Sequence, residues 1–227
     1  SDEAFRLAMV DKVGQNTDGE SFKQITFSEY YSAVQPVPSL IEQDSVGIIV
    51  AKGYILNGKQ PAGQIGGEST SALLKKARFD DKVKAVVLRV DSPGGSAFAS
   101  EKIRQEVIAL KDAGKPVVVS MGSLAASGGY WISASADYIY ATPTTLTGSI
   151  GIFGMFATFE NVLAIWGINS DGVSTSEWAG ISATRALDPN VSAVVQRHIE
   201  HGYHEFISLV AKECDMSLEQ VDRIAQG

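Results

Sequence analysis

The chain has 227 residues, of which 44% are hydrophobic and 20% charged, a balance typical of a globular protein with a substantial core. Its formal net charge of −7 argues against a nucleic-acid-binding protein, because no concentrated basic face is present. The single cysteine, Cys214, excludes an intrachain disulfide bond. The mixed-charge start of the chain predicts no signal peptide, and no apolar run reaches the roughly 18 residues of a membrane helix, so we expect a soluble chain.

The first part of the chain, residues 1–44, is predicted to be an arm that precedes the main domain. Apolar residues at helical spacing predict a helix over Glu3–Val13. Residues 25–45, which contain two prolines, are expected to form an extended linker.

The main domain is predicted over residues 45–227. Apolar runs predict strands over 46–55, 84–91, 116–121 and 137–142, with a short further strand and turn over 168–175. Helices are predicted over 66–80, 96–115, 157–167, 189–215 and 217–226, and for the segment that follows Ser127. Strands that alternate with helices predict an α/β fold, with a largely parallel sheet flanked by helices.

A serine at a strand-to-helix junction is the first candidate for chemistry. Ser127 lies in LAASGGYW, where its neighbours are alanines and glycines that leave the hydroxyl sterically open. The free N–H groups at a helix start favour negative charge, so the N–H of Gly128 can bind a developing oxyanion beside a nucleophilic serine. The competing interpretation is that Ser127 is an ordinary helix cap.

The stretch DSPGGS, residues 91–96, offers a second N–H donor. It also ends a strand, and Gly94 or Gly95 can bring an N–H into close approach. In a parallel sheet both junctions lie at the carboxyl ends of strands, where such folds place their sites. The alternative is that SPGG forms no more than a tight turn.

Three motifs together resemble one family of peptidases. DSPGGS, then SMGSLAASGGYWISASAD, then TGSIGIFG occur in the order and spacing of signal peptide peptidase A (protease IV). The similarity runs from about Val46 to the end of the chain, and it is closest to the C-terminal repeat of the long, two-repeat form. It implies a ClpP/crotonase-like fold, here with an N-terminal helical arm.

The resemblance implies a role for four residues. Ser127 matches the acylated nucleophile, and the backbone N–H groups of Gly94 and Gly128 match the oxyanion donors. Ser149 matches the serine that hydrogen-bonds the catalytic lysine of a Ser–Lys dyad. The glycine-rich segments on both sides of the serine can pair with an extended peptide as added strands. The residues expected to bind substrate in this way are Gly95, Ser96, Gly148 and Ile150.

The sequence departs from the family at the lysine. The matching stretch, Val173–Arg185, has Glu177 and Trp178 but no lysine, and there is none from Gly128 to Ala211. Arg185 cannot replace it, because a guanidinium stays protonated. Either the chain is an inactive homologue, or the lysine comes from an N-terminal repeat of the same protein. We expect the chain alone to be inactive or weakly active.

Other residues give weaker indications. His198, His201 and His204 recur at spacings of three, but an exposed helix explains them better than a metal site does. No histidine lies between Ser127 and His198, which disfavours a Ser–His–Asp triad. Three lysines precede the serine without a motif that marks a catalytic base: Lys12, Lys23 and Lys52.

The expected function is therefore that of a serine endopeptidase that degrades cleaved signal peptides. The resemblance implies a bacterial inner-membrane protein with its catalytic domain on the periplasmic side, a homo-oligomer, and no metal or cofactor. Two alternatives remain: a catalytically silent assembly module of the same fold, and a crotonase-like enzyme that binds acyl-CoA with the same paired N–H groups.

Overall fold

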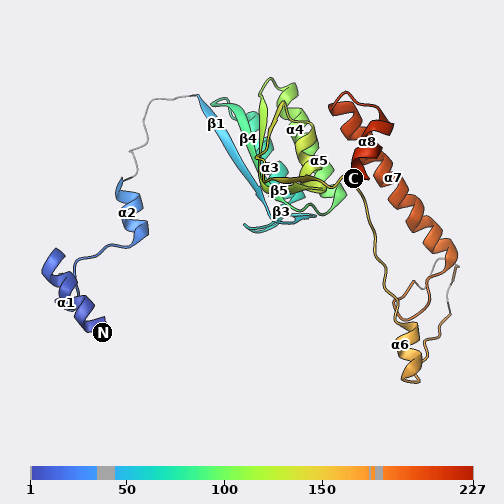
Figure 1. Cartoon of the computed structure of the whole chain (residues 1–227), viewed down its shortest axis with the longest axis horizontal. Coiled ribbons are helices and arrows are strands. Elements are labelled where there is room, and N and C mark those ends of the chain that lie inside the picture. The colour runs from blue at the N-terminus through green and yellow to red at the C-terminus, as the bar shows by residue number, and fades with distance from the viewer. Residues whose placement is uncertain (1, 35–43, 174, 177–180, 227) are drawn as a thin grey trace. The chain divides into compact units, whose positions relative to one another are not determined.

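The computed structural model describes residues 2–34, 44–173, 175–176 and 181–226 (Figure 1). The chain divides into two compact units, Ser1–Glu42 and Gln43–Gly227. The sequence analysis placed the boundary between arm and domain at residues 44 and 45. Each unit is described by itself.

The first unit contains the helices α1 (Asp2–Val13) and α2 (Phe27–Val34). The Phe5 ring meets the Phe22 ring edge-on at 6.0 Å between centroids. Helix α1 confirms the predicted N-terminal helix, whereas the extended linker is wrong over α2. The cause is a capping box: Thr26 Oγ1 accepts the N–H of Glu29, and the Glu29 carboxylate accepts the N–H of Thr26. The prolines of the linker lie outside the described residues.

The second unit is built on a parallel sheet. The strands β1 (Ser45–Lys52), β4 (Val83–Ser92), β5 (Val117–Ala126) and β6 (Tyr138–Tyr140) lie side by side in that order, and β7 (Leu146–Gly148) pairs with the end of β5. All these pairings are parallel, as expected for apolar runs separated by helices. The short strands β2 (Ile55–Leu56) and β3 (Ile65–Gly66) form a separate parallel pair.

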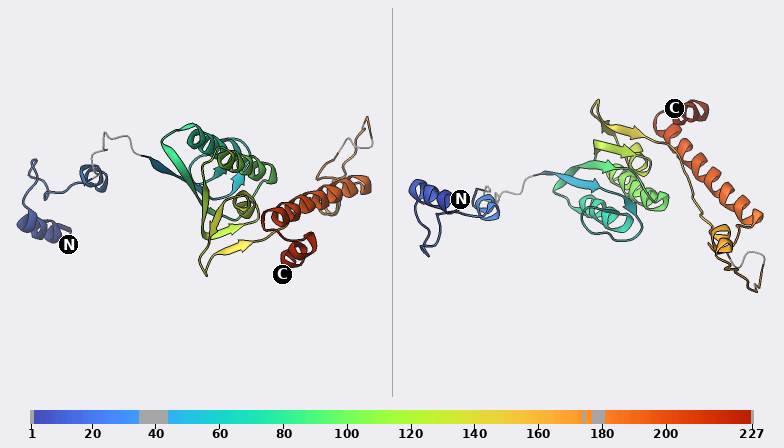
Figure 2. Two further views of the ribbon diagram at one scale, coloured as in Figure 1. Left: turned by 90° about the horizontal axis from the view of Figure 1, so that it is seen from above. Right: turned by 60° about the horizontal axis from the view of Figure 1, so that its bottom comes forward.

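Three helices cover one face of this sheet: α3 (Gly67–Phe79), α4 (Ala97–Asp112) and α5 (Gly128–Ala134) (Figure 2). Alternate residues of β1 and β4 point into the shared core, because side chains alternate between the two faces of a strand. The predicted α/β fold with a largely parallel sheet flanked by helices is confirmed. The largest fully buried side chains of this core are Ile55, Ile65, Leu74, Leu88, Ile103, Leu110 and Ile132.

A second core joins α5 to the C-terminal helices α7 (Pro189–Glu213) and α8 (Leu218–Ala225). The Trp131 ring packs at 4.6 Å between centroids against Phe206, which is fully buried. Helix α6 (Glu160–Ile165) confirms another predicted helix. The strand predicted at 168–175 is wrong over the described residues 168–173, which form no strand. No helix of the described residues has both the length and the apolar character that crossing a membrane requires.

Candidate active site

Ser127 lies between the end of β5 and the first residue of α5, in a strained backbone conformation. Its φ of 51° and ψ of −118° are unusual for a residue other than glycine. Its N–H donates to the carbonyl of Gly148 at 2.8 Å, and its carbonyl accepts the N–H of Trp131 at 2.9 Å. These two backbone hydrogen bonds hold Ser127 in an energetically unfavourable backbone conformation.

The hydroxyl of Ser127 does not cap the helix that it precedes. A capping serine accepts an N–H from the first turn, and no such bond is present here. The structure therefore disfavours the interpretation of Ser127 as an ordinary helix cap. Strain of this kind at a strand-to-helix turn also exposes the nucleophilic serine of other hydrolases.

The turn Pro93–Gly95 reaches the serine at a distance that only glycine permits. Gly94 has a φ of 104°, and a Cβ added to it would lie 2.7 Å from the nitrogen of Gly128 and 2.8 Å from the Cβ of Ser127. A Cβ added to Gly128 would lie 3.2 Å from the nitrogen of Gly95. The glycine turn and the Ser127 junction are thus in direct contact. The sequence predicted that both lie at the same edge of the sheet, but not that they touch.

The N–H groups of these glycines differ in their partners. The N–H of the buried Gly94 donates to Ser92 Oγ at 3.1 Å, and Ser92 Oγ donates to the carbonyl of Gly53 at 2.7 Å. In the described part of the chain, the N–H groups of Gly95 and Gly128 have no such partner. Gly95 is an exposed residue, whereas Gly128 is buried.

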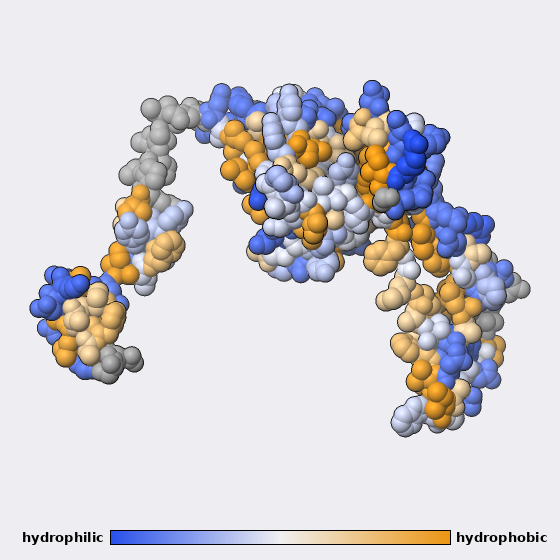
Figure 3. Space-filling view, in the orientation of Figure 1, coloured by the Kyte–Doolittle hydropathy of each residue, from blue (hydrophilic) through white to orange (hydrophobic). Residues whose placement is uncertain are grey.

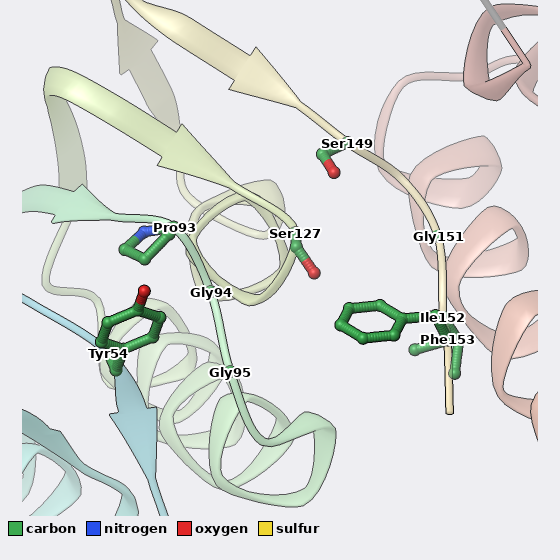
Figure 4. Close-up of a pocket in the computed structure, with 9 residues that line it drawn as sticks. All are labelled: Tyr54, Pro93, Gly94, Gly95, Ser127, Ser149, Gly151, Ile152 and Phe153. Carbon is green, nitrogen blue, oxygen red and sulfur yellow. The ribbon is translucent and has the colours of Figure 1, made fainter. Parts of the chain in front are cut away.

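Ser127 opens into a cavity of about 520 Å³. Ser149, with a φ of 49°, faces the same space from the segment after β7, and the ring of Phe153 lies across from the Ser127 hydroxyl (Figure 4). Four of the predicted site residues therefore share one cavity: Ser127, Gly94, Gly95 and Ser149. The full lining consists of Tyr54, Pro93, Gly94, Gly95, Ser127, Ser149, Gly151, Ile152 and Phe153.

Three residues predicted to bind substrate do not line this cavity. Ser96 caps α4 by accepting the N–H of Ala99 at 3.2 Å, and its hydroxyl donates to Asn57 at 2.6 Å. The carbonyl of Gly148 accepts the N–H of Ser127, and Ile150 is buried in the second core. Their role in binding substrate stays a prediction.

The sequence analysis missed Tyr54 as a lining residue. It treated residues 46–55 as one strand, but β1 ends at Lys52. Gly53 follows with a φ of 103°, in contact with the carbonyl of Gly63, and directs Tyr54 to the cavity. The lysine–glycine pair after the apolar run was the available signal for this turn.

No lysine or histidine lines the cavity among the described residues. His198, His201 and His204 lie on α7, outside the lining. Within the same described residues no group of three or more histidine, cysteine, aspartate and glutamate side chains could hold a metal ion. Glu177 and Trp178, in the stretch that should carry the lysine, lie outside the described residues.

A polar cluster behind the serine joins α4, α5 and α7. The Trp131 indole N–H donates to Glu101 at 2.8 Å, and Arg104 binds the same carboxylate through two nitrogens. Arg104 also donates to Ser135, which donates to Glu213, each at 2.9 Å. Burial raises the pKa of Glu101, but the hydrogen bonds from Arg104, Gln105 and Trp131 outweigh burial and lower it overall. The cluster fixes the short helix that begins beside the serine.

Comparison with known proteins identifies the family. Residues 109–227 match the model of peptidase family S49. The chain belongs to this family. It is 50% identical over 220 residues to Protease 4 of Salmonella typhi, which covers 97% of this chain and 35% of that protein. It is 33% identical over 155 residues to the putative signal peptide peptidase SppA of Enterococcus faecium, which covers 68% of this chain and 45% of that protein.

The predicted resemblance to signal peptide peptidase A (protease IV) is thereby confirmed. The chain spans about a third of the length of the Protease 4 relatives that it matches in Salmonella typhi and Haemophilus influenzae. Among solved structures it is similar to a point mutant of ClpP1 from Listeria monocytogenes, with a TM-score of 0.48 and 16% identity over 78% of this chain and 77% of that one.

Proposed function

We propose that this chain carries the nucleophile and the oxyanion donors of a serine peptidase with a Ser–Lys dyad. The observation that supports it best is the strained Ser127, whose hydroxyl caps no helix and opens into a cavity beside unpartnered N–H groups. A family membership alone does not assign a role to a residue, whereas a hydroxyl held in this way is suited to attack a carbonyl.

In the proposed reaction, Ser127 Oγ attacks the carbonyl carbon of a peptide and a base takes its proton. The carbonyl oxygen becomes an oxyanion that accepts N–H hydrogen bonds, the amine leaves with a proton from the base, and water then hydrolyses the acyl-enzyme. We assign the donors to Gly128 and Gly95. The sequence analysis expected Gly94, but its N–H is already held by Ser92.

The base is proposed to be a lysine supplied by a second domain of the same fold, an N-terminal repeat of the same protein. The cavity lining of the described residues holds no group that could serve. Ser149, whose hydroxyl faces the same cavity as Ser127, is placed to accept a hydrogen bond from such a lysine (Figure 4). A lysine that is buried on binding of the two domains can stay neutral near pH 7.

The proposed substrates are peptides left after signal sequences are cleaved, bound in an extended conformation. The turn Pro93–Gly95 and the segment Gly151–Phe153 flank the cavity and can pair with a peptide backbone. Tyr54, Ile152 and Phe153 supply apolar surface for its side chains. By analogy with the family, the protein would act as an oligomer on the periplasmic side of the bacterial inner membrane.

The test is the Ser127→Ala variant, assayed on a peptide p-nitrophenyl ester with and without a separately made domain that carries the lysine. We expect turnover to fall at least about 10³-fold in the variant, because only binding and the oxyanion donors remain. Ser123→Ala is the matched control, since Ser123 is an exposed serine of the same strand. Near-parental turnover of Ser127→Ala would refute the proposal and leave the assembly module or the acyl-CoA enzyme.

A further inference from the structure

Ser92 is a fully buried serine whose hydroxyl joins two parts of the candidate site. It has 0% exposure, donates to the carbonyl of Gly53 at 2.7 Å and accepts the N–H of Gly94 at 3.1 Å. Gly53 begins the turn that directs Tyr54 to the cavity. A single side chain therefore ties the end of β1 to the turn that faces the nucleophile.

The backbone of Ser92 also packs against the helix that begins beside the nucleophile. A Cβ added to Gly129 would lie 2.8 Å from the carbonyl oxygen of Ser92 and 3.3 Å from its Cβ. Ser92 thus contacts α5 two residues after Ser127.

The bond to Ser92 decides which glycine N–H is presented to the cavity. The Gly94 N–H points to Ser92 Oγ, while the Gly94 carbonyl accepts the N–H of Ile55 at 2.9 Å. The N–H of Ser96 is also used, because it donates to the carbonyl of Ile55 at 2.8 Å. Among the described residues of this turn, the N–H of Gly95 alone stays open, next to Gly128.

We propose that Ser92 is a positioning residue, which withdraws the N–H of Gly94 and thereby presents the N–H of Gly95 to the oxyanion. This inference rests on the proposed function. Ser92 touches neither substrate nor reacting atoms. Its contribution is to fix the peptide plane between Pro93 and Gly94, which carries the Gly94 N–H, while the N–H of Ile55 holds the next plane through the Gly94 carbonyl. Dipoles that are fixed before substrate binds stabilise a transition state without reorganisation.

Ser92→Ala removes the partner of two backbone groups at once. With the separately made domain that carries the lysine present, we expect kcat for a peptide p-nitrophenyl ester to fall about 10- to 100-fold, with KM within about two-fold, because loss of one whole oxyanion donor costs about 10²–10³. Ser71→Ala is the matched control. Ser71 is also a buried serine of this unit, but its hydroxyl has no hydrogen-bond partner among the described residues. That variant should keep the parental kcat.

A second measurement tests the inference without any variant. The chain is labelled with ¹⁵N-glycine and titrated with a peptide boronic acid, which forms a tetrahedral adduct with a nucleophilic serine. We expect the amide protons of Gly95 and Gly128 to move downfield, and that of Gly94 to stay. A shift of Gly94 with no shift of Gly95 would overturn the role of Ser92.

The adduct titration and the ester assay together distinguish failure of this inference from failure of the proposed function. If Ser127→Ala still forms the adduct and hydrolyses the ester, the proposed function fails, whatever Ser92 does. If adduct and hydrolysis depend on Ser127 but Ser92→Ala keeps the parental kcat, the nucleophile stands and the role of Ser92 is refuted. An equal loss of kcat in Ser71→Ala would also refute it, by showing a general response to core substitution.

Discussion

The two walls of the cavity differ in how much of this chain supports them. Ser127 and the turn Pro93–Gly95 follow the ends of β5 and β4, two strands of the main core. The opposite wall, Ser149–Phe153, continues into a segment with large exposed apolar side chains (Figure 3). Exposed apolar surface of this kind is typical of interaction sites. The nucleophile wall is thus complete within the chain, and the facing wall has unburied apolar surface: Phe153, Met155, Phe159, Ile165 and Trp166.

The largest difference in unfolding free energy between the two walls is expected for a pair of phenylalanine variants. Phe206 is 0% exposed beneath Trp131, whereas Phe153 is 91% exposed. Phe206→Ala should lower the free energy of unfolding by about 3–5 kcal/mol, because it leaves a cavity in the core. Phe153→Ala should change it by less than about 0.5 kcal/mol. Urea denaturation of both variants measures this. Similar losses in both would show that the facing wall is as well packed as the first.

The same contrast explains which parts of the fold the sequence could predict. The strands β4 and β5 and the helices α3, α4 and α7 follow from apolar periodicity, since each buries one face in a core of this chain. The linker prediction failed at α2 because a local capping box outweighed nearby prolines. Proline and glycine mark breaks reliably only when no side chain satisfies the backbone.

The candidate site was predictable where motifs carry it. Ser127, Gly128 and the glycine turn were identified because small residues follow two successive strands, and because three motifs in this order resemble one family. The choice between Gly94 and Gly95 was not predictable, because it depends on the direction of a peptide plane fixed by Ser92. The position of Tyr54 in the cavity lining was not predicted, because the apolar pattern predicted one strand over residues 46–55 and the turn at Gly53 was missed.

Two glycine-to-alanine variants compare how closely backbone segments approach each other in the two walls. Gly94→Ala places a Cβ 2.7 Å from the backbone nitrogen of Gly128, at a φ of 104°. We expect a loss of about 2–4 kcal/mol in unfolding free energy and of most esterase activity. Gly151→Ala meets no atom within 4 Å and should be near neutral for stability. Differential scanning calorimetry and the ester assay report both, and an active, stable Gly94→Ala would contradict the geometry.

A smaller effect is expected for two tryptophans. Trp131→Phe removes the indole N–H that donates to Glu101, whereas Trp166 is 78% exposed. The first variant should lose about 1–3 kcal/mol, because a partly buried carboxylate oxygen loses one of its two donors and keeps only Arg104 Nε. Trp166→Phe should stay within about 0.5 kcal/mol of the parent. Guanidinium denaturation distinguishes them, and an equal response would mean that Glu101 contributes nothing to the first wall.

The smallest effect is a pH dependence that comes from the same carboxylate. Although burial raises the pKa of Glu101, hydrogen bonds from Arg104, Gln105 and Trp131 hold it below its ordinary value of 4.5. A lowered pKa means that the unfolded chain binds the proton more readily, so this stabilisation is present above 4.5 and is lost as pH falls through the lower folded pKa. Glu101→Gln removes the charge at every pH. The difference in Tm between parent and variant should therefore be largest at pH 7 and should shrink progressively below pH 4.5, as thermal unfolding at a series of pH values would show. A difference that stays constant down to about pH 3 would mean that the ionised carboxylate does not stabilise the wall that holds Ser127.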